Sequence, residues 1–162
     1  MSTTNQSTQN NLDNATHTTM FGIPVTYTQN RIAIGPLDEP IENAFKAPML
    51  PGFCDLITHG FHDGEFAAYQ RDGIDVQLTP MQVAAIIRFF YQEQMPPIRL
   101  VSCWLGKFST GFAQKLAWEL RTVVLASTVV VYPHPDGQLQ TPDGFWRLFE
   151  GVPMLPVPDY VY

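Results

Sequence analysis

The stretch GFCDLITHG, residues 52–60, points most directly to the fold of this chain. Phe53 to Thr58 is a short apolar run, typical of a strand covered on both faces, as in a parallel sheet. The run ends in His59-Gly60, although a glycine alone is enough to end a strand. The imidazole of His59 therefore needs either a packing role or a chemical one.

A hairpin and a helix are expected after this strand. Phe66–Gln70 and Ile74–Leu78 flank an Asp-Gly turn, which favours a β-hairpin. In the next stretch, LTPMQVAAIIRFFYQEQ, Thr79 is a good N-cap, a proline follows at the first helical position, and Gln82 falls where a capping-box partner belongs. The sequence therefore predicts a helix from Thr79 that ends before the prolines at 96 and 97.

IRLVSC, residues 98–103, is a second short strand of the buried type. The pattern predicts further strands on either side, at Ile23–Thr28, Arg31–Ile34, Val123–Tyr132 and Phe145–Phe149. It also predicts a second helix, capped by Ser109 or Thr110 and running to about Leu120. Strands that alternate with helices predict an α/β fold with a mostly parallel central sheet flanked by helices.

The chain of 162 residues is long enough to bury its own core, and 45% of its residues are hydrophobic. Residues 1–18 are mainly Asn, Gln, Ser and Thr, with almost nothing to bury. We therefore expect a disordered polar arm over residues 1–18 and a single α/β domain over residues 19–162.

The charge of the chain argues against two classes of partner. The formal net charge is −6, and the nine Lys and Arg residues are scattered without a cluster. We therefore expect no nucleic-acid face and no binding to an anionic membrane surface. The N-terminus has neither a basic residue nor an apolar segment like that of a signal peptide, which predicts a cytoplasmic protein and leaves export by a signal-independent machine open.

His59 and Cys103 each stand at the carboxyl end of a predicted strand. In parallel sheets, ligands and reactive groups lie beyond these ends. If the two strands are neighbours, both side chains emerge at the same edge, where a His can take the proton of a Cys thiol and the thiolate can act as a nucleophile. The pair therefore predicts a catalytic dyad, and Gly60 would let the backbone approach a substrate closely.

Other polar residues near this pair have more than one interpretation. His62 and Asp63 suit the rim of a substrate cleft, and Trp104 suits its wall. In a second hypothesis, Cys54 and His62 join His59 and Cys103 as zinc ligands, which would make a zinc-dependent hydrolase. Cys54 argues against this set, because residues five apart on a strand point to opposite faces.

Asp55 lies in the middle of a strand expected to be buried, where an unpaired carboxylate is costly. It could pair with Arg99 on the neighbouring strand, or it could floor a pocket that selects a basic side chain. The sequence favours the structural pairing and leaves the pocket open.

Several enzyme classes do not fit the order of these residues. Papain-like enzymes place Cys before His, whereas His59 precedes Cys103 here. A phosphatase loop needs Arg at the sixth position after the Cys, which is Ser109 in this chain. The sequence also contains no nucleophile elbow, P-loop or dinucleotide glycine fingerprint.

ITHG, followed after a hairpin and a helix by IRLVSCWLG, resembles the caspase-like clan of cysteine peptidases. In that clan one strand ends in His-Gly and a later strand ends in the catalytic Cys. The resemblance covers roughly residues 50 to 151, which also resemble C-terminal domains of bacterial polymorphic toxins. It implies a caspase-like topology, with Cys103 as nucleophile, His59 as general base, and the N–H groups of Gly60 and Cys103 as the oxyanion hole.

The resemblance also implies a biological setting. A cysteine endopeptidase of this kind would act on a protein substrate, as an antibacterial effector or toxin delivered by a specialised secretion system, with a cognate immunity protein as partner. Toxin autoprocessing domains of the clan bind inositol hexakisphosphate, but Lys and Arg are sparse here, so no cofactor and no metal are expected. The alternative is a non-catalytic binding or adaptor module on the same scaffold.

Overall fold

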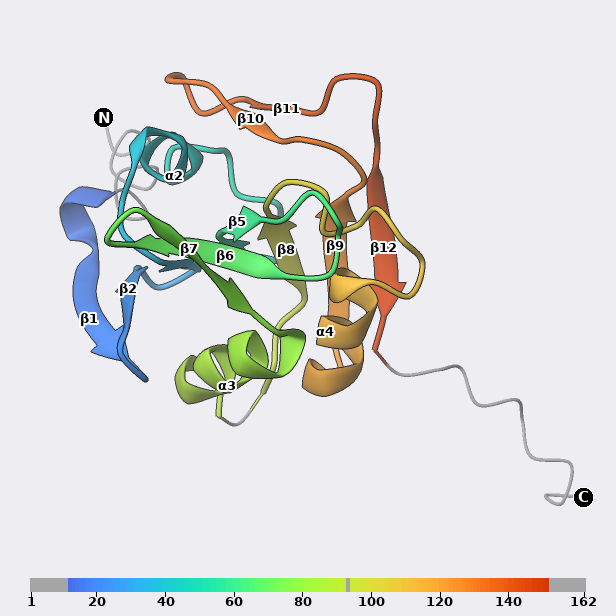
Figure 1. The fold of residues 1–162 in the computed structure, drawn as a ribbon, viewed down its shortest axis with the longest axis horizontal. Coiled ribbons are helices and arrows are strands. Elements are labelled where there is room, and N and C mark those ends of the chain that lie inside the picture. The colour runs from blue at the N-terminus through green and yellow to red at the C-terminus, as the bar shows by residue number, and fades with distance from the viewer. Residues whose placement is uncertain (1–11, 93, 152–162) are drawn as a thin grey trace, which may run out of the picture.

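A seven-stranded sheet forms the centre of the protein, with its strands in the order β1-β2-β3-β4-β8-β9-β12 (Figure 1). The computed structural model describes residues 12–92 and 94–151. The four middle strands are parallel to one another, and the outer strands are antiparallel to their neighbours. The strands are β1 Thr16–Met20, β2 Ile23–Tyr27, β3 Arg31–Ile34, β4 Cys54–Ile57, β8 Ile98–Val101, β9 Val123–Ser127 and β12 Trp146–Glu150.

The predicted α/β class is confirmed, but the sheet is mixed rather than mostly parallel. Parallel pairing is limited to β3–β4, β4–β8 and β8–β9. Short turns join β1 to β2 and β2 to β3, and such connections make successive strands antiparallel. The sequence THTTM of β1 does not predict a strand, because it lacks an apolar alternation. In the structure, four of its five residues are exposed.

The sequence led us to expect ordered structure from Thr19 onward, but regular structure begins earlier. Leu12–Asn14 forms a 3-10 helix, η1, and β1 starts at Thr16, so both lie inside the predicted arm of residues 1–18. β1 pairs with β2 along its whole length, and backbone hydrogen bonds thus hold a segment that has little apolar surface to bury. The rest of the predicted arm, residues 1–11, lies outside the described residues.

The hairpin predicted after His-Gly is confirmed, and it belongs to a second, three-stranded sheet. Its strands β6 (Ala67–Arg71) and β7 (Ile74–Leu78) are joined by Asp72 and Gly73, which have φ angles of 52° and 77°. Two residues with positive φ are what a two-residue type I′ turn requires. A short strand, β5 (His59–Gly60), pairs with β6 and so anchors the hairpin at His59.

Helices cover both faces of the main sheet (Figure 1). α3 (Pro80–Phe90) and α4 (Phe112–Leu120) pack against each other and share an apolar core with Leu56 and Leu100. α2 (Glu39–Ala44) packs with Ile57 and Val101, the next residues along the same strands. Because successive strand residues point to opposite faces, each strand contributes to both cores.

The predicted capping box of α3 is confirmed. The Thr79 hydroxyl oxygen accepts the Gln82 N–H at 3.2 Å, and Gln82 Oε1 accepts the Thr79 N–H at 2.8 Å. These two bonds satisfy N–H groups that the first turn of a helix leaves without an intrahelical partner. The helix therefore begins where the sequence predicts.

The cap predicted for α4 at Ser109 or Thr110 is wrong, because the N-cap residue is Gly111. The first two N–H groups of the helix donate to backbone carbonyl oxygens of Gly64 and Leu105, at 3.0 and 3.1 Å. Loops that pack against the helix start therefore replace the side-chain hydroxyl, and the local sequence pattern does not reveal such partners.

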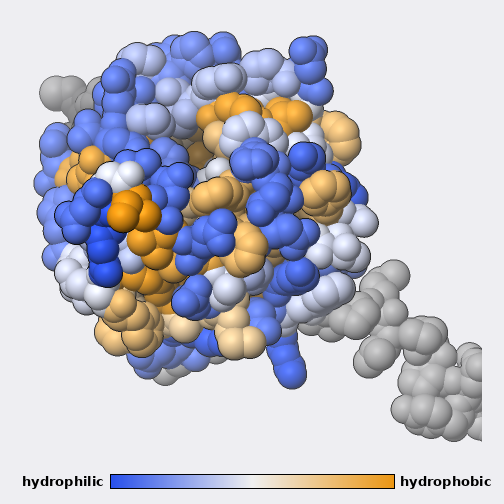
Figure 2. Space-filling model, in the orientation of Figure 1, coloured by the Kyte–Doolittle hydropathy of each residue, from blue (hydrophilic) through white to orange (hydrophobic). Residues whose placement is uncertain are grey.

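A short two-stranded ribbon of β10 (Tyr132–Pro133) and β11 (Leu139–Gln140) lies beside α2 (Figure 1). The face shown in Figure 2 is mostly hydrophilic, with separate apolar patches. Among the described residues, none of the helices has the length and apolar character needed to cross a membrane.

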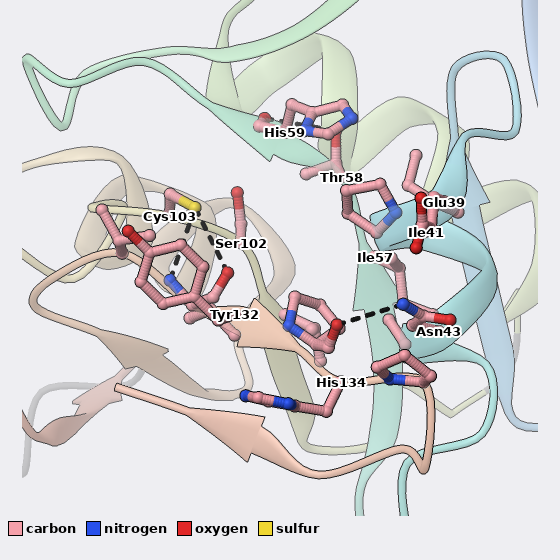
Figure 3. Close-up of a pocket in the computed structure, with 17 residues that line it drawn as sticks. Glu39, Ile41, Asn43, Ile57, Thr58, His59, Ser102, Cys103, Tyr132 and His134 are labelled. Atoms are coloured by element: carbon pink, nitrogen blue, oxygen red, sulfur yellow. Dashed lines mark hydrogen bonds between the residues drawn. The ribbon is translucent and has the colours of Figure 1, made fainter. Parts of the chain in front are cut away.

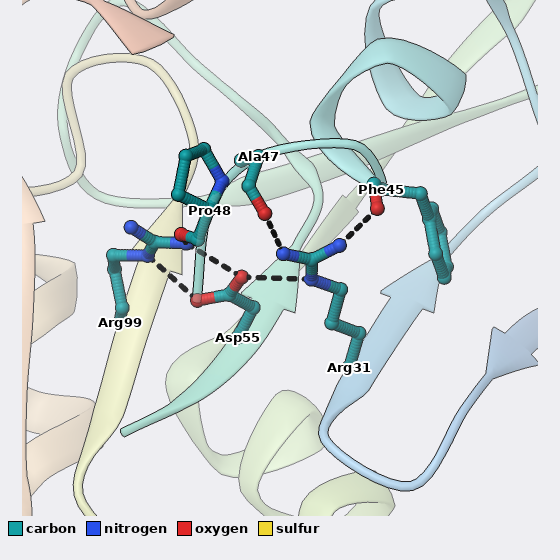
Figure 4. A network of polar contacts seen from close by, with 6 residues as sticks. All are labelled: Arg31, Phe45, Ala47, Pro48, Asp55 and Arg99. Carbon is teal, nitrogen blue, oxygen red and sulfur yellow. Dashed lines mark hydrogen bonds and ion pairs between the residues drawn. The ribbon is translucent and has the colours of Figure 1, made fainter. Parts of the chain in front are cut away.

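A buried ionic network joins the three strands β3, β4 and β8 (Figure 4). Asp55 on β4, only 1% exposed, accepts hydrogen bonds from Arg31 Nε at 3.1 Å, Arg99 Nε at 2.6 Å and Arg99 Nη2 at 2.8 Å. Burial lowers the pKa of Arg31 from its ordinary value, and the Asp55 carboxylate partly opposes this effect.

The arginines of this network also hold the chain between α2 and β4. Arg31 donates to the carbonyl oxygens of Phe45 and Ala47, and Arg99 donates to that of Pro48. The predicted pairing of Asp55 with Arg99 is confirmed, and Arg31 is a further partner. The alternative, a pocket floor that selects a basic side chain, is wrong because both carboxylate oxygens are already paired and buried.

The network predicts a large loss of stability for Asp55→Asn. This change leaves two buried guanidinium groups without a carboxylate, and breaking such a buried pair costs about 3–5 kcal/mol. Urea denaturation of the wild type and the variant measures the difference.

The matched control is Glu119→Gln, which weakens the exposed pair between Arg88 and Glu119, 3.4 Å apart. We expect a loss of less than about 1 kcal/mol for this variant. Equal losses in the two variants would contradict the role assigned to Asp55.

Candidate functional site

Three residues at the carboxyl ends of adjacent parallel strands form the candidate site. His59 follows β4 and Cys103 follows β8, and these two strands pair in parallel from Cys54–Ile98 to Ile57–Val101. The predicted neighbourhood of the two strands is therefore confirmed. Asp38, which sequence reasoning missed, follows β3 on the other side of β4.

Asp38 holds the ring of His59. The Asp38 Oδ2 atom lies 2.5 Å from His59 Nε2, and Asp38 Oδ1 accepts the Ile41 N–H at 3.0 Å as the N-cap of α2. A carboxylate can only accept, so Nε2 carries a proton, and in the neutral form of the ring Nδ1 is left as a proton acceptor. The signal in the sequence is Asp38-Glu39-Pro40, an N-cap followed by a proline in the first turn.

Cys103 is held by the segment that follows β9. The Val131 N–H donates to Cys103 Sγ at 3.4 Å, and the thiol donates to the Val131 carbonyl oxygen at 3.7 Å. Burial raises the pKa of the Cys103 thiol, and the backbone hydrogen bond with Val131 opposes part of this rise. Within the described residues there is no hydrogen bond between Cys103 and His59, so the predicted dyad shares a site without direct contact at rest.

Gly60 has a different structural role from the one that the sequence suggests. A Cβ at this position would lie 2.1 Å from the Cys103 carbonyl oxygen, 2.9 Å from Ser102 Oγ and 3.0 Å from Leu105 Cγ. The space beside Gly60 is therefore filled by the Cys103 loop and is not left open for a substrate. The absence of a side chain lets the loops after β4 and β8 pack directly on each other.

Two cavities flank His59. The first, of about 510 Å³, is bordered by both His59 and Cys103 and lies between α2 and the segment from Val130 to Pro135 (Figure 3). The second, of about 490 Å³, contains Asp38 and His59. Both volumes fall in the range of small-molecule sites.

The structure separates the three residues predicted to form a substrate cleft. His62 and Trp104 line the second cavity, on the Asp38 side of His59. Asp63 borders neither cavity, and its Oδ1 accepts the Glu65 N–H at 2.9 Å, which closes a turn. Asp63 therefore has a local structural role.

The proposed zinc ligands do not come together. Cys54 starts β4, whereas His59 follows the opposite end of that strand, and Cys54 borders a separate cavity with Tyr91. Across residues 12–92 and 94–151, no three His, Cys, Asp or Glu side chains are grouped closely enough to hold a metal ion.

The raised pKa of the half-buried Cys103 thiol predicts how it reacts with iodoacetamide. Only the thiolate reacts, and a raised pKa leaves less thiolate at neutral pH. In the native protein we expect the rate at Cys103 to keep rising above about pH 8.5, the ordinary thiol range, whereas in urea it should level off there. Peptide mass spectrometry follows Cys103 and Cys54 separately. Rapid labelling of native Cys103 that does not change between about pH 6 and 8 would show an ionised thiol instead.

Comparison with known proteins identifies a family without assigning an activity. No curated protein and no solved structure matches the chain. A family model described as "Domain of unknown function (DUF8616)" matches residues 29–141, a span that runs from before β3 to the end of β11 and includes Asp38, His59 and Cys103. Because the match covers well over half of the chain, the protein belongs to the DUF8616 family.

Proposed function

We propose that this protein is a cysteine endopeptidase in which Cys103 is the nucleophile, His59 the general base and Asp38 a positioning residue. One observation carries the proposal: a His whose ring is held by a carboxylate stands at the end of β4, and a Cys stands at the end of the neighbouring parallel strand, on the same cavity. This is the chemistry of a nucleophile, a base and a group that orients the base.

The resting state of Cys103 favours general-base catalysis over a preformed ion pair. The raised pKa keeps the thiol neutral, so its proton must leave as attack begins. In the proposed reaction Sγ turns from Val131 towards His59, and Nδ1 accepts the proton while sulfur attacks the peptide carbonyl carbon. The C–N bond breaks, the amine takes the proton from His59, and water then hydrolyses the thioester.

Two backbone N–H groups are available to stabilise the oxyanion. Within the described residues the Cys103 N–H donates no hydrogen bond. Gly60 pairs with Ala67, and the next pair carries the bond from the Phe61 N–H to the Phe66 carbonyl at 2.9 Å. Since bonded and non-bonded pairs alternate in an antiparallel ladder, the Gly60 N–H points away from β6. Both donors suit the predicted oxyanion hole.

The arrangement around the site suits an endopeptidase of caspase-like topology. Cavities on both sides of His59 offer room for a chain that continues in both directions from the cut bond. Parallel central strands with helices on both faces, and a hairpin between the His-Gly strand and the Cys strand, fit the resemblance to that clan.

We also propose the setting that the toxin resemblance implies, an effector that acts in target bacteria and is neutralised by an immunity protein. Its support is the sequence resemblance alone. Expression in the bacterial cytoplasm tests it: the wild type should arrest growth, and Cys103→Ala should not. Growth arrest by both forms would contradict a toxicity that depends on peptidase activity.

A binding module is the second candidate, favoured by one observation. The thiol is bonded to Val131 rather than to His59, and its pKa is raised, as expected for a structural cysteine. In that case the first cavity would hold a ligand without turnover.

Loss of cleavage on mutation of the dyad distinguishes the two candidates. We expect Cys103→Ala to abolish peptide-bond cleavage and His59→Ala to lower kcat by about 10²–10⁴-fold, the usual contribution of a general base. Sequencing of new protein N-termini in cells that express the wild type or Cys103→Ala measures the cleavage. The matched control is Cys54→Ala, which removes the other thiol and should retain activity; identical N-termini in all forms would favour the binding module.

Replacement of the positioning residue should affect catalysis and spare the fold. In Asp38→Asn the side-chain oxygen can still cap α2, since Asn is as good an N-cap as Asp. The carboxylate that fixes the His59 tautomer is lost, so kcat should fall by less than in His59→Ala, with KM unchanged. The control Asp63→Asn, at a carboxylate outside both cavities, should retain full kcat. A change in KM alone for Asp38→Asn would mean that Asp38 binds substrate.

A further inference from the structure

Most of the surface that lines the first cavity is apolar. The β9–β10 side contributes Val130, Val131, Tyr132, Pro133 and Pro135, and the sheet and α2 contribute Ile41, Ala44, Ile57 and Val101. The polar lining residues are Glu39, Asn43, Thr58, His59, Ser102 and His134, and of these Asn43 already donates to the Pro133 carbonyl oxygen at 3.2 Å (Figure 3). An occupant of this cavity therefore meets mainly aliphatic surface.

The charges around the cavity limit what it can bind. Glu39 is the one Asp, Glu, Lys or Arg among the described lining residues, and it is exposed. An acidic side chain would find no Lys or Arg, only the imidazoles of His59 and His134, and a basic side chain would find one carboxylate, which is exposed to solvent. Burial of an unpaired charge is strongly unfavourable, so the cavity discriminates against both.

Ser102 adds a second, independent observation. The residue is 4% exposed and borders the cavity beside Cys103, and its Oγ atom is buried with no hydrogen-bond partner among the described residues. Buried hydroxyl groups are normally paired, and a hydroxyl can rotate to suit a partner. The atom also lies 2.9 Å from the place of a Cβ on Gly60, close to a proposed oxyanion donor. The unpaired hydroxyl points to a polar atom that an occupant brings.

We propose that this cavity binds an aliphatic side chain, that of the residue whose carbonyl carbon Cys103 attacks, and that Ser102 Oγ donates a hydrogen bond to a carbonyl oxygen of the substrate backbone. The inference rests on the proposed peptidase function and adds the substrate class. We assign this cavity to the acyl side of the cut bond because Cys103, whose sulfur would become bonded to the acyl carbon, borders this cavity and not the second one.

Peptidyl acyloxymethyl ketones that differ only in the last residue test the proposal on the full chain. Sγ displaces the carboxylate of such a probe, so one C–S bond forms as one C–O bond breaks, and the thiol proton is released. Intact-protein mass spectrometry gives the rate at Cys103 for probes that end in norleucine, Asp or Lys. We expect norleucine to react about tenfold faster or more than either charged probe, the usual discrimination of an apolar pocket.

Substitutions in the wall sharpen the test. Val130 lines the cavity and is half-buried, so Val130→Asp should remove the preference for norleucine and raise the rate with Lys. The matched control, Leu148→Asp, places the same charge at an exposed position on β12, away from the cavity, and should keep the wild-type order of probes. Thermal melts establish whether both variants fold. If one does not, the order of the rates of the three probes with the wild type still tests the proposal.

Ser102→Ala tests the polar contact by itself. Labelling should slow for all three probes with their order unchanged, while stability should hold or rise because an unpaired buried hydroxyl is removed. Unchanged labelling rates would overturn the role of Ser102.

The outcomes separate this inference from the function on which it rests. If Asp or Lys probes react fastest, and His59→Ala slows them, the peptidase stands and the aliphatic pocket is wrong. If no probe labels wild-type Cys103 faster than it labels Cys103 of the His59→Ala variant, the proposed function itself fails.

Discussion

The pairing of Asp55 with Arg31 and Arg99 is the constraint on which the rest of the structure depends (Figure 4). One carboxylate fixes two arginines from the flanking strands, and the guanidinium groups in turn fix the carbonyl oxygens between α2 and β4. Buried charges need such complete pairing, because each unpaired partner would be costly. The network therefore sets the register of β3, β4 and β8, the three strands whose ends carry Asp38, His59 and Cys103.

The site follows from this register, and its resting geometry favours one order of events. His59 is oriented by Asp38 before any substrate arrives, whereas Cys103 is bonded to Val131 and kept neutral by burial, which raises the pKa of its thiol. In the proposed mechanism, a general base that is already oriented and a nucleophile that stays neutral would keep the thiol unreactive in the absence of a substrate. The segment around Val131 also forms a wall of the apolar cavity, so the group that fills the cavity touches the segment that holds the thiol.

The parts of this fold with a local signal could be predicted from the sequence. The Thr79–Gln82 capping box, the Asp72-Gly73 turn and the two apolar strands before His59 and Cys103 are all determined by near neighbours. Strand β1 could not be predicted, since its polar residues are held by pairing with β2, through the backbone and through a hydrogen bond between His17 and Thr26, and not by an apolar pattern of their own. Asp38 and Arg31 were missed although the more distant pair of Asp55 and Arg99 was predicted, because the sequence pattern indicated that β8 lies beside β4 but did not indicate that β3 lies on its other side.

Asp38 interacts with two partners at once, and this has a consequence for when the site forms as the chain folds. The same carboxylate caps α2, a helix of six residues, and orients His59. A helix so short is unstable alone and forms only when the surrounding chain packs against it. His59 can thus be aligned only after the segment between β3 and β4 has folded, so under the proposed function a nascent or partly unfolded chain would be unable to cut its neighbours during synthesis.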